Sequence, residues 1–132
     1  MQNAFFLKTN GDYTRINYSD IIYIECVKNY VRIITTKTAF IALVTMKHVE
    51  KILPQDEFCR IHRSYIVSLN HIHRFSNKYV NIGERRLPIS DQNKDILMEK
   101  FVILTPASRN KNEFCNKLIL LFFLLFDFSI NL

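Results

Sequence analysis

The sequence predicts a single domain of antiparallel β-strands with a minor α-helical part. From Ala4 to about Phe101, short apolar runs rich in β-branched and aromatic residues alternate with turn residues. The Asn10-Gly11 pair is a strong signal for a two-residue hairpin, because both positions tolerate a positive φ. Helical patterns interrupt the strands at only two places, and connections this short favour antiparallel pairing.

Ten segments have the pattern of a strand. Within residues 20–26 the alternation puts Ile24 and Cys26 on one face and Tyr23 and Glu25 on the other. The predicted strands are residues 4–8, 13–17, 20–26, 30–36, 39–44, 58–62, 65–68, 71–75, 79–82 and 85–89.

Two helices are predicted. Residues 45–53 form the first, which Thr45 can cap and Pro54 ends. The second begins with Ser90 as its cap and Asp91 in its first turn. Their apolar faces are expected to consist of Met46, Val49, Ile52 and Leu53 in the first helix and Ile96, Leu97 and Phe101 in the second.

Composition points to a basic, reduced protein. The chain of 132 residues is 48% hydrophobic and carries a formal net charge of +6, which favours polyanions or anionic surfaces as partners. Three cysteines at wide spacing (Cys26, Cys59 and Cys115) and an N-terminus without a signal peptide indicate reduced thiols in a cytoplasmic protein. A disulfide framework is not expected.

Patterns for enzymatic chemistry are missing from the sequence. There is no phosphate-cradling glycine loop, nucleophile elbow or paired-carboxylate signature. His71 and His73 share a strand face, but no Cys-x-x-Cys or His-x3-His pair accompanies them, so a zinc site is not predicted. We therefore expect a protein without catalysis, metal or cofactor.

The order of the pieces resembles a known family. "INYSDIIYIECVKNYVRIIT", "TMKHVEKIL", "FCRIHRSYIVSLNHIHRF" and "RRLPIS" are similar, in this order and spacing, to the LytTR DNA-binding domain of bacterial transcriptional regulators. The resemblance covers residues 4–101 and leaves residues 102–132 as a C-terminal extension. It implies an elongated arrangement of small antiparallel sheets, with loops at one edge that enter the DNA major groove.

The same resemblance implies a place in a two-component system. The domain is commonly the output end of a response regulator, and no receiver domain precedes it in this sequence. The chain is therefore either a fragment of a longer regulator or a stand-alone output module. A homodimer on repeated half-sites, and a receiver domain or membrane partner supplied elsewhere, are the candidate partners beside double-stranded DNA.

The turn "CVKNY" holds the first candidate contacts. Lys28 suits a phosphate, and Asn29 suits a bidentate contact with adenine, with Tyr30 beside them. The alternative is a plain β-turn in which Asn29 only accepts an unusual φ. The family resemblance implies contact. At the start of the first helix, Thr45 and Lys47 favour a phosphate, although a solvated cap is equally compatible.

"FCRIHRSYIVS" holds the second set. Arg63 lies where strand alternation breaks, so its guanidinium can leave the sheet and match guanine O6 and N7 or a phosphate. The resemblance also implies a DNA-contacting residue at this position, whereas the alternative is an ion pair with Asp56 or Glu57. Ser64 and Arg60 are candidate phosphate contacts. His62 is interpreted as a hydrogen-bonded structural histidine.

The third set departs from the family pattern. Many members carry an arginine shortly after the "L-P-I/V-S" element, whereas this chain has "SDQNK". Gln92 or Asn93 remains a candidate reader of adenine, and Lys94 a candidate phosphate contact. Asp91 would repel phosphate.

Other functions compete with duplex DNA binding. An RNA-binding β-module could stack bases on Tyr30, Tyr65 and Tyr79. A membrane-surface or protein-interaction module could use the basic face and the apolar run 118–126, which is well short of the ~20 residues that span a bilayer. For that run we expect docking or self-association.

Overall fold

The computed structural model describes residues 3–107 and Leu121. The chain divides into a unit Met1–Val102 and a unit Ile103–Leu132. The apolar run 118–126 and Cys115 lie outside the described residues, with the exception of Leu121. The predicted boundary between domain and extension at residues 101 and 102 stays a prediction.

Strands and helices succeed one another closely within the described part. The strands are β1 (Ala4–Thr9), β2 (Asp12–Asn17), β3 (Ile21–Val27), β4 (Tyr30–Thr35), β5 (Ala39–Ala42), β6 (Phe58–His62), β7 (Tyr65–Ser68), β8 (Ile72–Phe75), β9 (Tyr79–Ile82) and β10 (Arg85–Pro88). The helices are α1 (Met46–Ile52) and α2 (Lys94–Glu99), with short 3-10 helices at Tyr18–Asp20 and Leu69–His71. Every predicted strand and both predicted helices are present, whereas the two 3-10 helices were not predicted.

The strands form antiparallel sheets of two, five and three strands. The hairpin β1-β2 turns at Asn10 and Gly11, whose φ angles of 51° and 87° confirm the predicted turn. The five-stranded sheet has the order β5-β4-β3-β7-β6, and the three-stranded sheet the order β10-β9-β8. The predicted fold class, mainly antiparallel β with minor α, is confirmed.

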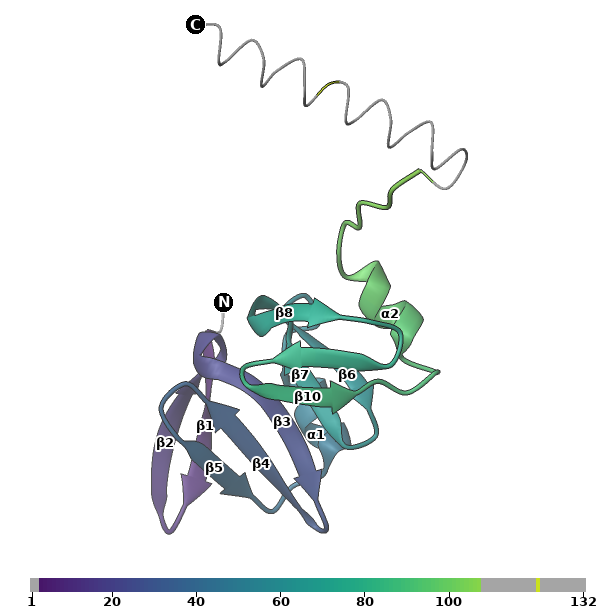
Figure 1. The fold of residues 1–132 in the computed structure, drawn as a ribbon. Helices are drawn as coiled ribbons and strands as arrows, with labels where there is room; N and C mark the ends of the chain where they lie inside the picture. The colour runs from purple at the N-terminus through teal and green to yellow at the C-terminus, as the bar shows by residue number, and fades with distance from the viewer. Residues whose placement is uncertain (1–2, 108–120, 122–132) are drawn as a thin grey trace, which may run out of the picture. The chain divides into compact units, whose positions relative to one another are not determined.

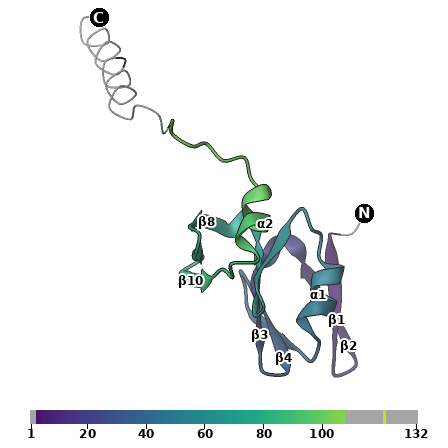
Figure 2. The same ribbon diagram turned by 90° about the vertical axis from the view of Figure 1, so that its right-hand side faces the viewer.

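The five-stranded sheet lies between two apolar layers (Figures 1 and 2). On one face, the hairpin β1-β2 and α1 cover a cluster that includes Ile24 and Val49. On the other face, the three-stranded sheet and α2 cover a cluster that includes Tyr23, Ile61 and Leu97. Because both faces are covered, neighbouring residues of β3 are buried on opposite sides. The strands that carry the turns are therefore packed on both sides.

Several details of the predicted helices are wrong. Ile52 is 42% exposed and Ile96 is 47% exposed, because each helix is short and presents only a narrow stripe to the core. Ser90 is not the cap of α2. Residues 90–93 first form a turn, in which the Asn93 N–H donates to the Ser90 carbonyl over 3.0 Å. Asn93 occupies the cap position, and the acidic residue of the first helical turn is Asp95.

Within residues 3–107, no helix is long and apolar enough to cross a membrane. The same residues hold no cluster of three potential metal-ligating side chains. Cys26 and Cys59 are free thiols.

Candidate nucleic-acid interface

Three chain connections meet at one end of the five-stranded sheet. They are the β3-β4 turn at residues 28–29, the β6-β7 turn at residues 63–64 and the segment that leads from β5 into α1. Antiparallel register causes this, since Val27 pairs with Tyr30, Glu25 with Tyr65 and Val31 with Ala42. Most of the predicted contact residues therefore lie at this end, which we call the turn edge.

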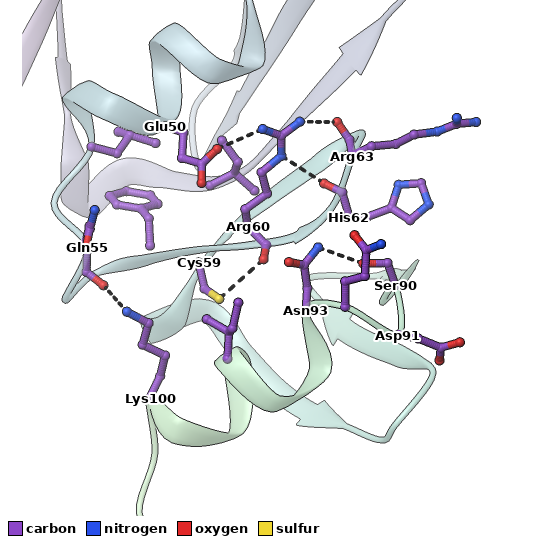
Figure 3. Close-up of a pocket in the computed structure, with 15 residues that line it drawn as sticks. Glu50, Gln55, Cys59, Arg60, His62, Arg63, Ser90, Asp91, Asn93 and Lys100 are labelled. Atoms are coloured by element: carbon purple, nitrogen blue, oxygen red, sulfur yellow. Dashed lines mark hydrogen bonds and ion pairs between the residues drawn. The ribbon is translucent and has the colours of Figure 1, made fainter.

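Arg63 is exposed in the β6-β7 turn. β6 ends at His62, and Arg63 follows it in the turn. The register of β6 against β7 shifts earlier than the predicted break, between Arg60 and His62. The Arg63 guanidinium projects away from the side chains of Arg60 and Glu50 (Figure 3). No carboxylate lies within 4.0 Å of it among residues 3–107, so the ion pair with Asp56 or Glu57 considered above is absent there.

Arg60 holds the backbone of this turn. Its Nη2 donates to the Arg63 carbonyl over 2.7 Å and its Nε to the His62 carbonyl over 3.2 Å. Its Nη1 pairs with the Glu50 carboxylate of α1 over 2.8 Å (Figure 3). The guanidinium therefore fixes two successive carbonyls of the turn and links the turn to α1.

Two further hydrogen bonds close the turn. The Ser64 N–H donates to His62 Nδ1 over 3.1 Å, so His62 is hydrogen-bonded as predicted. The Cys26 N–H donates to the Ser64 carbonyl over 2.9 Å and joins this turn to the end of β3. The carbonyls of His62, Arg63 and Ser64 and the Ser64 N–H are thus all hydrogen-bonded.

The β3-β4 turn has much less support. Lys28 and Asn29 are both exposed, and Tyr30 is half-buried at the start of β4. The residue with positive φ is Lys28 (55°), not Asn29 as considered above, so the strain falls on the cationic residue. The Cys26 thiol, 3.7 Å from the Lys28 carbonyl, makes a weak contact with the turn.

At the start of α1 the predicted cap is confirmed. Thr45 Oγ1 accepts a hydrogen bond from the His48 N–H over 3.1 Å. This bond occupies the hydroxyl as a cap, whereas Lys47 is exposed.

The third candidate set lies in the turn before α2 and at the first residue of that helix. Asn93 Nδ2 donates to Ser90 Oγ over 2.7 Å, so the Asn93 amide is engaged within its own turn. Gln92 is exposed and Lys94 half-buried. The exposed Asp91 points outward (Figure 3).

A groove of about 690 Å³ joins the second and third sets. Arg60 and Arg63 line it from β6 and its turn, and Ser90 and Asn93 line it from the turn before α2 (Figure 3). The Ser90 N–H donates to the Ile61 carbonyl over 2.8 Å, which seats that turn against the edge strand β6. Tertiary structure thus brings together residues some 30 positions apart in the sequence.

An ionic cluster holds the three-stranded sheet against the five-stranded sheet. The buried Glu25 carboxylate accepts from Arg32 over 2.7 Å and from Arg85 over 3.1 Å. Arg85 Nη1 also donates to the Tyr23 hydroxyl over 2.8 Å. The pKa of Arg85 is raised, first by this hydrogen bond and then by Glu25, so the guanidinium stays charged. Arg32 and Arg85 therefore act as structural cations.

The sequence matches a known domain family. Residues 11–101, more than half of the chain, match the family described as the LytTr DNA-binding domain. The chain belongs to the LytTr family. Membership confirms the expected class of function, which is DNA binding.

Curated relatives of this LytTr domain include sensory transduction proteins. The chain is 39% identical over 57 residues to the sensory transduction protein LytT of Bacillus anthracis, covering 43% of this chain and 23% of that protein. It is 32% identical over 63 residues to the CO-responsive transcriptional regulator RcoM of Rhodospirillum rubrum, covering 48% and 27%. The chain thus spans about a quarter of the length of these relatives.

A solved structure confirms the LytTr fold. A LytTr DNA-binding domain from Bacillus cereus superposes with a TM-score of 0.65 at 22% sequence identity, covering 76% of this chain and 97% of that chain. At this identity the likeness concerns the arrangement of strands and helices.

Glu50 is the site residue that sequence reasoning missed in this LytTr domain. It lies ten positions before Arg60, on a different element, and no local pattern links the two. A helix-surface glutamate ordinarily indicates only a solvated face.

Proposed function

We propose that this LytTr domain binds duplex DNA sequence-specifically, with its turn edge entering the major groove. The single observation that carries the proposal is Arg63: an exposed guanidinium, with no carboxylate partner among residues 3–107, on a turn whose backbone is held by hydrogen bonds. Such a fork matches O6 and N7 of guanine. A fixed backbone reduces the entropy lost when it binds.

Around Arg63, cationic and hydroxyl side chains would position the duplex. We assign Lys28, Lys47, Lys94 and Ser64 to phosphates, because phosphate contacts need charge or donors but no exact geometry. Asn29 and Gln92 are the exposed amides suited to adenine. We assign Thr45 and Asn93 to the support of these turns, since both already hold hydrogen bonds within the protein. Tyr30 receives the same assignment because it begins β4 directly after the β3-β4 turn.

Arg60 receives a different role from the one expected from sequence. A phosphate contact would require its guanidinium to leave the Glu50 carboxylate and two backbone carbonyls. We assign it instead to holding the turn that presents Arg63. This assignment makes Arg60 a positioning residue.

For the whole protein, we propose a cytoplasmic transcriptional regulator of the response-regulator type. The relatives are named sensory transduction proteins and a transcriptional regulator, and the chain matches about a quarter of their length. A receiver or other sensory part would supply the signal, and a homodimer would occupy repeated half-sites. Without catalysis, its output would be occupancy of the operator.

Selection from a random duplex pool tests the proposed function. The chain should enrich one half-site, and Arg63→Ala should relax the choice at one base position. Enrichment of no sequence, together with binding to anionic vesicles or single-stranded RNA, would overturn the proposal.

A further inference from the structure

The arginines of the described part divide into two groups. Arg32, Arg60 and Arg85 each pair with a carboxylate and fasten one element to another. Arg15, Arg63, Arg74 and Arg86 have no carboxylate within 4.0 Å among residues 3–107. Arg63 lies at the turn edge and Arg15 donates to the Asn17 side chain on the hairpin β1-β2, whereas Arg74 and Arg86 lie together at a second place.

Arg74 and Arg86 lie on one face of the three-stranded sheet. Both pair across the strands with Asn81 of the central strand β9, so the three side chains form a row on the same face. The opposite face carries Val80, which is fully buried in the core. The row therefore faces away from the protein. We call it, with Tyr79, the outer face.

The outer face is built to present charge. Arg74 and Arg86 are exposed, and their backbones lie two strand spacings apart, roughly 10 Å. The Arg86 guanidinium stacks 5.2 Å from the centre of the Tyr79 ring, which is 44% exposed. Glu84 is the one acidic residue in the segment from residue 72 to residue 89, and it lies in the β9-β10 turn. The surface is thus cationic and unpaired.

Two backbone hydrogen bonds made by residues 89 and 90 link the entry of β9 to the strand β6. The Ile89 N–H donates to the Lys78 carbonyl over 2.8 Å, and the next residue, Ser90, donates to the Ile61 carbonyl over 2.8 Å. The exposed Lys78, at the entry to β9, therefore lies beside the turn that borders the Arg63 groove. Lys78 is thus a cation that lies between this turn, which itself carries the exposed Asp91, and Tyr79 of the outer face.

We propose that the outer face binds backbone phosphates of the duplex outside the base pairs read at the turn edge. This rests on the proposed function and adds a second contact to it. Arginines on a sheet face suit phosphates, because they supply charge and donors without having to follow a groove. An acidic protein surface would fit the same charges. DNA is favoured because the exposed Lys78 lies between the turn that borders the Arg63 groove and the outer face.

The test compares two double variants with the same change of charge. Arg74→Gln/Arg86→Gln removes the outer-face cations. Lys8→Gln/Arg15→Gln is the control, because Lys8 lies 5.5 Å from the Tyr13 ring and Arg15 5.9 Å from the Phe6 ring on the hairpin β1-β2. Affinity for a long duplex of arbitrary sequence is measured against salt concentration, with thermal melts to confirm folding.

The outer-face variant should lower the slope of log affinity against log salt by about 1.8, or about 0.9 for each lost phosphate contact. Its affinity should fall on the order of tenfold at low salt, equally for all sequences, while the control changes little. On progressively shorter duplexes, the affinity of the wild-type chain should fall to that of the outer-face variant. The affinity of the variant should depend much less on duplex length.

Equal slopes for the outer-face variant and the control would overturn the proposal and leave an acidic protein as the partner of this face. Failure of the proposed function looks different. In that case the wild-type chain shows no preference among sequences. The slope of log affinity against log salt on a duplex of arbitrary sequence still shows whether the outer face binds phosphates.

Discussion

The two turns at the turn edge differ in how firmly they are held. The β6-β7 turn is fixed by Arg60, by the His62 ring and by the Cys26 amide, through four hydrogen bonds of 2.7–3.2 Å. The β3-β4 turn has a positive φ at Lys28 and a weak thiol contact. Reading a base edge requires fixed geometry, whereas neutralising a phosphate requires only charge within reach. The difference therefore assigns base reading to the first turn and phosphate contact to the second.

The largest effect is expected when the reader itself is removed. Arg63→Ala should cost roughly 1–3 kcal/mol for the preferred duplex and relax specificity at one base position. Binding to matched and scrambled duplexes measures this, with thermal melts alongside. A strongly lowered melting temperature with normal discrimination by the folded fraction would make Arg63 a structural residue.

Loosening the held turn should have the next largest effect. Arg60→Lys keeps the charge but loses the fork that binds two carbonyls, so the preferred duplex should lose about 1 kcal/mol. The salt slope should stay the same, because no phosphate contact is removed. The measurement is discrimination between matched and scrambled duplexes.

Glu50→Gln separates the two roles considered for Arg60. The pair is partly exposed, so its loss should cost only a few tenths of a kcal/mol in stability. A positioning role predicts slightly weaker discrimination and an unchanged salt slope. Higher affinity with a steeper slope would instead mean that the released Arg60 contacts a phosphate.

Changing the loosely held turn should affect all sequences alike. Lys28→Ala removes one cation and should lower the salt slope by about 0.9. The ratio of affinities for matched and scrambled duplexes should stay the same. A fall in that ratio would show that the β3-β4 turn also reads bases and would break the comparison.

The two cysteines of the described part differ in exposure, since Cys26 is half-buried and Cys59 is buried. Burial raises the pKa of the Cys59 thiol in β6 above its usual value near 9.0, so little thiolate forms at neutral pH. In a Cys115→Ser background, Cys26 should be alkylated on the order of tenfold faster than Cys59. The Cys59 rate should still rise above pH 9. Equal alkylation rates would mean that β6 opens often enough to expose Cys59.

The smallest effect is expected from truncation after Leu104. Because the LytTr match ends at residue 101, removing residues 105–132 should leave DNA affinity and discrimination unchanged. Solubility or oligomeric state should change. Unfolding of the shortened chain would place the boundary of the domain farther along the chain.

The sequence by itself determined the secondary structure and the class of function. Strand alternation, the Asn10-Gly11 turn and the Thr45 cap are local signals, each decided within a few residues. The order and spacing of four segments sufficed for the family, because related chains keep these patterns. The prediction that Ser90 caps α2 was wrong. The Ser90 N–H donates to the Ile61 carbonyl of another element, and residues 90–93 form a turn before the helix begins.

Only the tertiary structure decided which cations are available. The sequence marks both Arg60 and Arg63 in "CRIHR" as candidate DNA contacts, yet the first pairs with Glu50 of α1 and the second has no carboxylate partner among residues 3–107. Arg85 and Arg86 are adjacent, yet one reaches back 60 positions to Glu25 and the other lies on the outer face. An ion pair depends on which elements pack together, and that information is spread over the whole chain. Because both faces of the five-stranded sheet are buried, α1 and the three-stranded sheet pack against it. This packing brings Glu50 to Arg60 and Glu25 to Arg85.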